Sequence, residues 1–342
     1  LTLAWSRFIL PETLIKSLSI IFIGYVFKSL KRKKFYTLEF SFILILMTFI
    51  RADAIFFVIP AVYLIFILHK FDIGIKKLIT FFLIFSIPWS FWTYRNLSVG
   101  ASIFPNIYES YETKTKGKFP SGYNKWILSW AYNQYDFAKA LNSTHYDSNS
   151  KKNFNYMNIE IKDNIYFNKE EKYKTKKLLN ELKSQTGKPF PENIDNKFKD
   201  LAIKRINENK TYNYFILPLK RSLNLWFNPV YSHGWPVELQ TKLNDNKINF
   251  NTTNFYEKIK LVKFFPVEIF TKALLFLWMI LLIILFFLIP FQKKNENIKI
   301  FYSICLQLVI IKTIFFAYTG FFETRYIVNL IPFFEVLIIL TF

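Results

Sequence analysis

The sequence predicts an α-helical integral membrane protein with about six to seven membrane helices or half-helices and a mostly helical extracytoplasmic domain inserted among them. The first reason is composition, because 52% of the 342 residues are hydrophobic and Phe occurs 41 times against only 8 Gly. The second is distribution, because the apolar residues gather in blocks at the two ends of the chain. A soluble chain of this length rarely needs so much apolar side chain.

The N-terminal block begins with residues 14–30, which are apolar enough for a short span and are followed by a basic cluster. Two apolar arms, 40–50 and 54–68, are each shorter than the roughly 20 residues of a straight span. They form either one long broken helix or two short helices that turn at Arg51. We prefer the turn, because it keeps the basic clusters before and after the arms on one side of the membrane.

A further helix is predicted over 78–92, and the chain leaves the membrane within 88–96. That stretch reads Pro-Trp-Ser-Phe-Trp-Thr-Tyr-Arg-Asn. Trp and Tyr favour the bilayer interface because their rings are apolar and their tips form hydrogen bonds. An Arg beyond them reaches water or lipid phosphate.

The middle region, 96–262, is rich in Tyr, Asn and Lys and holds no membrane-span candidate. Apolar residues at helical spacing predict helices over 169–182 and 196–209, separated by Pro189 and Pro191. Trp side chains in this region could stack against sugar faces, although most are expected in the core: Trp126, Trp130, Trp226 and Trp235.

The C-terminal block holds the clearest membrane helix, 264–289, followed by an outward helix over 300–318 and an inward segment over 326–342. Lys312 lies inside the outward helix and must either snorkel or face a polar interior. This topology gives three domains: N-terminal membrane helices in 1–95, an extracytoplasmic domain in 96–262, and C-terminal membrane helices in 263–342. The short loops rich in Lys and Arg then all lie in the cytoplasm.

Composition argues against several function classes. The net charge of +21 comes mainly from Lys interleaved with Asn and Ile, which is typical of an AT-rich genome, so no nucleic-acid partner is expected. Cys305 is the only cysteine, and His69, His145 and His233 lack further ligands at metal-binding spacing, so no metal site is expected. No cofactor motif is identified.

Charged residues at the predicted outer ends of helices are the candidate site. Charges at membrane depth persist where they pair, snorkel or bind a charged ligand. Arginine suits phosphate because its planar fork donates two hydrogen bonds and keeps its charge. The alternative is that each residue is an interfacial anchor or belongs to a pair, such as Glu323 with Arg325. The candidates are Glu12, Arg51, Asp53, Arg95, Glu323 and Arg325.

Three stretches, in this order, resemble the polytopic GT-C glycosyltransferases, a group that includes protein O-mannosyltransferases and the aminoarabinose and lipopolysaccharide-core transferases. Residues 46–53, ending Arg51-Ala52-Asp53, are similar to their Arg-Pro-acidic/Asn turn. Residues 88–96 are similar to their Pro-Trp-x-x-Arg-Asn exit, and residues 323–332, which read Glu-Thr-Arg-Tyr and end in Pro, to their Glu-x-Arg-Tyr and Pro ending. The resemblance covers about residues 1–105 and 262–342.

The resemblance implies an inverting transferase that takes a sugar from a polyprenyl phosphate at the outer face of the membrane. Arg51, Arg95 and Arg325 would bind the lipid phosphate, Glu323 would hold Arg325, and Tyr326 belongs to the same substrate-binding motif. The family's acidic general base lies in a first outer loop, which here would precede Leu1. The catalytic base is therefore expected outside this chain, which also starts without a signal-peptide pattern and is interpreted as a fragment.

The expected location is a bacterial inner or plasma membrane, and the expected partners are membrane lipid, a polyprenyl-phosphate sugar, and a glycan, lipid or protein acceptor. The lipid-linked sugar is a substrate, not a cofactor. One alternative is a non-catalytic membrane protein, such as a flippase partner or polymer-assembly scaffold, whose outer domain binds glycan or protein. Another is a truncated product without activity.

Overall fold

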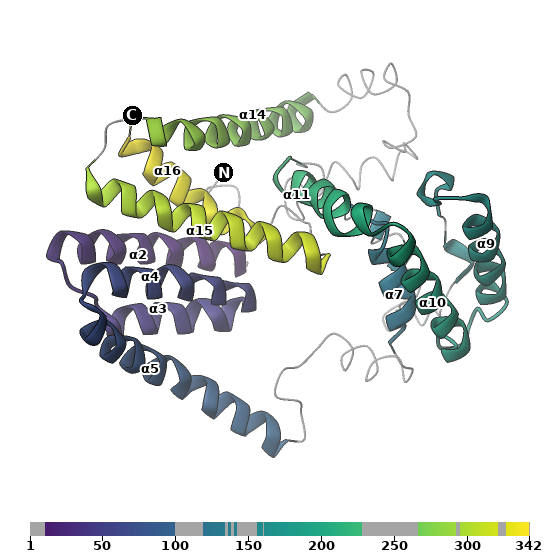
Figure 1. Cartoon of the computed structure of the whole chain (residues 1–342), viewed down its shortest axis with the longest axis horizontal. Coiled ribbons are helices and arrows are strands. Elements are labelled where there is room, and N and C mark those ends of the chain that lie inside the picture. The colour runs from purple at the N-terminus through teal and green to yellow at the C-terminus, as the bar shows by residue number, and fades with distance from the viewer. Residues whose placement is uncertain are drawn as a thin grey trace. The chain divides into compact units, whose positions relative to one another are not determined.

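The computed structural model describes most of the chain, and its helices are shown in Figure 1. The described residues are 11–99, 119–133, 136–137, 140–141, 156–159, 161–227, 266–291, 295–320 and 326–341. They are mainly helical and contain no strand, which confirms the predicted helical class. Within these ranges, two helical segments are long and apolar enough to cross a membrane, Thr13–Arg32 and Glu296–Thr319.

The chain divides into two compact units. Unit 1 comprises Leu1–Trp89, Leu225–Phe315 and Glu323–Phe342, and unit 2 comprises Ser90–Asn224 and Phe316–Phe322. Each unit is therefore assembled from segments that are distant in sequence. The predicted domain limits at residues 95 and 262 stay a prediction, since 262 lies outside the described residues.

Unit 1 begins with a pair of packed helices, α2 (Pro11–Arg32) and α3 (Thr37–Ile50). The apolar side chains of α2 recur at helical spacing, as in Phe22, Val26 and Leu30, and all three are buried. The ring of Phe22 meets that of Phe40 edge to face at 5.2 Å. Such aromatic contacts supply much of the packing in a unit with so many Phe side chains.

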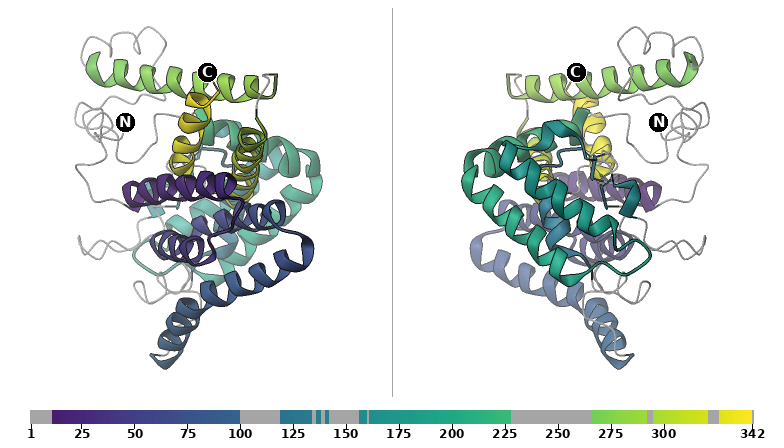
Figure 2. Two further views of the ribbon diagram at one scale, coloured as in Figure 1. Left: turned by 90° about the vertical axis from the view of Figure 1, so that its left-hand side faces the viewer. Right: turned by 90° about the vertical axis from the view of Figure 1, so that its right-hand side faces the viewer.

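The chain reverses at Arg51, whose backbone is extended at φ −149° and ψ 121°. A 3₁₀ helix, η1 (Ala52–Phe57), packs back against α3 and leads into α4 (Val58–Leu68). The predicted arms are thus two short helices joined by a turn, and the long broken helix is excluded. Figure 2 shows α2, α3 and α4 lying side by side.

The next helix, α5 (Phe71–Ser98), starts seven residues before the predicted residue 78 and ends six residues beyond 92. The predicted start was wrong because Lys76 and Lys77 lie within the helix, and straight-chain lysines are good helix formers. Pro88 lies inside the helix, although proline removes one backbone hydrogen bond there. The predicted exit segment is therefore helical through Asn96.

The C-terminal helices are α14 (Pro266–Leu288) with η6 (Ile289–Phe291), and α15 (Glu296–Thr319). They confirm the predicted helices over 264–289 and 300–318. The final segment is shorter than predicted, because it consists of a 3₁₀ turn, η8 (Val328–Leu330), and α16 (Ile331–Ile339). Proline in the first turn of α16 suits a new helix start, which explains the break.

Unit 2 contains α7 (Ser121–Leu128), α9 (Lys169–Lys183) and α10 (Glu192–Glu208), with η2 (Tyr156–Asn158) and η3 (Asp163–Ile165) between the first two. A π-helical turn, η4 (Tyr212–Ile216), leads into α11 (Leu217–Phe227). The helices predicted over 169–182 and 196–209 are confirmed, and α10 begins four residues early, directly after Pro191. Their buried side chains meet Tyr123 and Trp126 of α7 in one core.

Candidate functional site

A buried ionic cluster forms in unit 1 around the turn after α3. Arg51 ends α3, and its Nε donates a hydrogen bond of 2.8 Å to Oδ1 of Asp53 in the first turn of η1. Both side chains are only 10% exposed. Charges so far from water need partners, and the short turn supplies one for Arg51 within two residues.

Lys312 of α15 joins this pair from a distant part of the sequence. Its ammonium is fully buried and donates to Asp53 Oδ2 at 2.8 Å, to the backbone carbonyl of Tyr326 at 3.2 Å and to Asn329 Oδ1 at 3.0 Å. A lysine ammonium has three N–H groups, and these contacts occupy all three. Of the two predicted alternatives, Lys312 faces a polar interior and does not snorkel.

Tyr326 closes the cluster on the side of Arg51. The guanidinium carbon of Arg51 lies 5.0 Å from the centroid of the Tyr326 ring, a cation–π distance. The site therefore draws on three separate segments: the α3–η1 turn, α15, and the stretch that starts with Tyr326. Two of these segments, the one around Arg51 and the one around Tyr326, belong to the sequence stretches that resemble the GT-C glycosyltransferases.

Aromatic stacking links a third stretch to the first. The ring of Trp89, in α5, stacks on Phe49 of α3 at 5.0 Å with the planes 12° apart. Arg95 lies two turns further along α5 in unit 2, is exposed, and donates to Asn96 Oδ1 at 3.3 Å. The convergence of Arg51, Arg95 and Arg325 on one phosphate stays a prediction.

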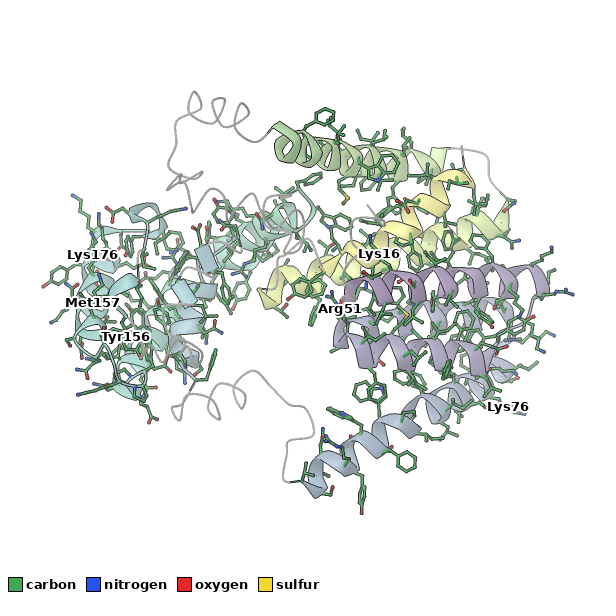
Figure 3. The ribbon with its side chains drawn as sticks, turned by 180° about the vertical axis from the view of Figure 1, so that it is seen from behind. Lys16, Arg51, Lys76, Tyr156, Met157 and Lys176 are labelled. Atoms are coloured by element: carbon green, nitrogen blue, oxygen red, sulfur yellow. The ribbon has the colours of Figure 1, made fainter. Side chains whose placement is uncertain are left out.

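Three predicted site residues cannot be placed as side chains. Glu323 and Arg325 lie outside the described residues. Glu12 lies in the first turn of α2, and only its backbone is described. Figure 3 shows Arg51 at one end of the helices of unit 1 and Lys76 toward the other end. The assignment of the Arg51 end to the outer face of the membrane stays a prediction.

Sequence reasoning missed two residues of the cluster, Lys312 as a partner of Asp53 and Asn329. Lys312 carried a signal, because a lysine within an apolar helix must find a partner. Asn329 carried none beyond its place in the third stretch. Asp53, one of the predicted candidates, accepts from both Arg51 and Lys312 and is the central acceptor of the cluster.

Unit 2 also buries two arginines, and protein oxygens accept hydrogen bonds from both of them. Arg221 is 4% exposed and donates to the backbone carbonyls of Ala131 at 2.9 Å, Ala317 at 3.1 Å and Leu128. Arg205, 3% exposed, donates to two carbonyls and pairs with Glu171. Burial lowers the pKa of Arg221 to about 10.

The aromatic side chains of unit 2 act mainly as core. Trp126 is fully buried and Trp130 is 5% exposed, as expected for most of the tryptophans, while Trp235 lies outside the described residues. Trp226, in unit 1, donates from its indole N–H to Thr313 Oγ1 at 2.9 Å. Burial raises the pKa of Tyr166 to about 12, and Asp163 adds to this effect. Of the described residues named here, none is an exposed sugar platform.

Within the described residues, no group of three or more His, Cys, Asp or Glu side chains could hold a metal ion. His145 and His233 lie outside those residues. No family model, curated protein or solved structure matches this chain. Functional inference therefore rests on the ionic cluster of unit 1 and on the three sequence stretches.

Proposed function

We propose that this chain is a membrane glycosyltransferase of GT-C type. It would transfer a sugar from a polyprenyl-phosphate donor to a glycan, lipid or protein acceptor of the cell envelope. The observation that carries the proposal is the meeting of Arg51 and Tyr326 across 5.0 Å, because these residues come from two of the three resembling stretches. The Trp89–Phe49 stack, which links the remaining stretch, adds support.

The cluster has the chemistry that phosphate departure requires. When the sugar leaves, negative charge grows on the phosphate oxygens, and fixed cationic donors stabilise it most where water is excluded. Arg51 supplies such a donor, and its Nε contact with Asp53 fixes the orientation of the guanidinium. The acceptor hydroxyl must also lose its proton to a general base.

The membrane assignment is part of the same proposal. Two helical segments have sufficient length and apolarity to cross, and the shorter apolar helices Thr37–Ile50, Ala52–Leu68 and Phe276–Leu288 would complete the bundle as half-helices or tilted spans. About six to seven such elements would place 96–262 outside a bacterial inner or plasma membrane. Exposed Phe and Leu side chains of unit 1, such as Phe42 at 63%, would then face lipid.

The test is a transfer assay on protein expressed from its native gene, with radiolabelled polyprenyl-phosphate sugars and envelope acceptors. Arg51→Ala is expected to lower transfer by at least about 100-fold, the usual cost of losing one charge-stabilising donor. Lys299→Ala is the matched control, because Lys299 is 64% exposed on α15. Undiminished transfer by Arg51→Ala would refute the assignment of Arg51. No transfer by the wild type with any donor would favour the non-catalytic scaffold.

A further inference from the structure

The carboxamide of Asn329 has a fixed orientation inside the cluster. Asn329 is 4% exposed, and its side-chain oxygen lies 3.0 Å from Lys312 Nζ. An ammonium can only donate, so the oxygen and not the nitrogen of the amide must face Lys312. The Nδ2 group is therefore turned away from Lys312.

This orientation leaves a buried donor without an acceptor. Among the described residues, no oxygen accepts a hydrogen bond from Asn329 Nδ2. Buried N–H groups in folded proteins are nearly always paired, because an unpaired donor has lost its water without replacement. The amide cannot relieve this by flipping, since its nitrogen would then face the ammonium. The missing acceptor therefore points to a ligand.

The charge of the cluster indicates what kind of ligand fits. Its described side chains include two cations, Arg51 and Lys312, and one carboxylate, Asp53. Lys312 is held by three protein oxygens, so it acts by positioning Asp53 and Asn329. An acceptor that carries negative charge would satisfy Asn329 Nδ2 and would be attracted by these two cations.

We propose that Asn329 Nδ2 donates a hydrogen bond to a phosphate oxygen bound beside Arg51, and that Lys312 fixes the amide for this contact. The inference rests on the proposed function for the place of the phosphate. It adds Asn329 as a neutral binding residue and Lys312 as a positioning residue. The phosphate belongs either to a lipid headgroup or to free phosphate in solution.

The test measures binding by thermal unfolding of the purified protein in detergent. The probes are undecaprenyl phosphate, inorganic phosphate, and undecaprenol as the uncharged control. The variant Asn329→Asp keeps an oxygen toward Lys312 but replaces the donor by a second carboxylate oxygen. It is expected to unfold at the same or a higher temperature without ligand, and to bind undecaprenyl phosphate at least tenfold more weakly.

Each outcome decides the inference. A shift with undecaprenyl phosphate alone that weakens in Asn329→Asp supports a lipid phosphate, and the same result with inorganic phosphate supports free phosphate. Equal affinity in wild type and Asn329→Asp, or no wild-type shift with either phosphate, overturns it; if Asn329→Asp does not fold, Asn329→Ala is measured in its place. Phosphate binding that depends on Asn329, in a protein that transfers no sugar, leaves the inference standing and counts against the glycosyltransferase.

Discussion

The two units of the molecule bury their cationic side chains in different ways. In unit 2, Arg221 meets three backbone carbonyls from chain segments that it ties together. In unit 1, Lys312 and Arg51 share the single carboxylate of Asp53. Backbone carbonyls are neutral acceptors that every helix end leaves open, whereas a buried carboxylate must itself be stabilised.

This difference separates a structural use of buried charge from a site. Arg221 donates to carbonyl groups near the ends of helices, and these acceptors are neutral backbone groups. The unit 1 cluster holds a carboxylate, two cations and an unpaired amide N–H in one place. Polar groups that are paired incompletely in a native structure are where a binding partner is expected.

The largest effect on stability is expected from removing the buried Lys312 of unit 1. Lys312→Met is expected to lower the free energy of unfolding by about 3–5 kcal/mol, because Asp53 loses a partner while it stays buried. Denaturant unfolding in detergent measures this, with Lys299→Met on the same helix as control. Equal stability of these two variants would mean that the Lys312–Asp53 contact contributes nothing.

The matching change in unit 2 is Arg221→Met. It removes the donor from the carbonyls of Ala131, Ala317 and Leu128, and a loss of about 2–4 kcal/mol is expected from the unpaired acceptors. Hydrogen exchange would show faster exchange in α7 and α11. Lys220→Met, at the exposed neighbouring position, should leave exchange unchanged. If the amide exchange rates of α7 and α11 are equal in the two variants, the hydrogen bonds of Arg221 do not hold these helices together.

Two glycines, Gly122 in unit 2 and Gly24 in unit 1, differ in how closely other atoms approach their backbone. A Cβ at Gly122 would lie 2.2 Å from the carbonyl oxygen of Asp195, so Gly122→Ala should cost about 1–3 kcal/mol of unfolding free energy. A Cβ at Gly24, inside α2, would meet nothing within 4 Å. Gly24→Ala should therefore change stability by about 1 kcal/mol or less, in the stabilising direction. Thermal unfolding of the two variants compares them directly, and an equal effect would contradict the tight contact.

The smallest effect is expected from the exposed charges of unit 2. Hydrogen bonds from Lys174 and Lys204 hold the pKa of Glu170 below its usual range. The folded state then binds fewer protons, so the stabilisation is present above the pKa of the unfolded chain and is lost as the pH falls through the lowered value. Acid titration of Glu170→Gln against wild type should show nearly superimposed curves, because exposed ion pairs contribute little. A large separation would show that this surface network matters.

Helix positions could be predicted from the sequence because they depend on local spacing. The apolar periodicity of Leu178 and Leu182 located α9, and the long apolar run located α14. The start of α5 was missed because lysines at a membrane edge fit both a loop and a helix. The full extent of unit 2 could not be predicted, since its segment Phe316–Phe322 begins inside the membrane helix predicted over 300–318.

The candidate site could be predicted only in part, because one of its contacts joins residues that are distant in sequence. Arg51 and Asp53 are two residues apart, and their pairing could be expected from sequence. The contact of Lys312 with Asp53 joins residues 259 positions apart and depends on how the helices pack. No local pattern encodes it, and the role of Asn329 follows only once Lys312 is in place.

The tight approach of α7 and α10 bears on the order in which unit 2 assembles. The backbone N–H groups of Gly122 and Tyr123, at the start of α7, donate to the carboxylate of Asp195 at 3.0 and 2.8 Å. The first turn of α7 therefore obtains its cap from a residue synthesised more than seventy positions later. During translation, the first turn of α7 cannot receive this cap until α10 has been synthesised. Its amides should therefore gain protection from hydrogen exchange late, together with those of α10.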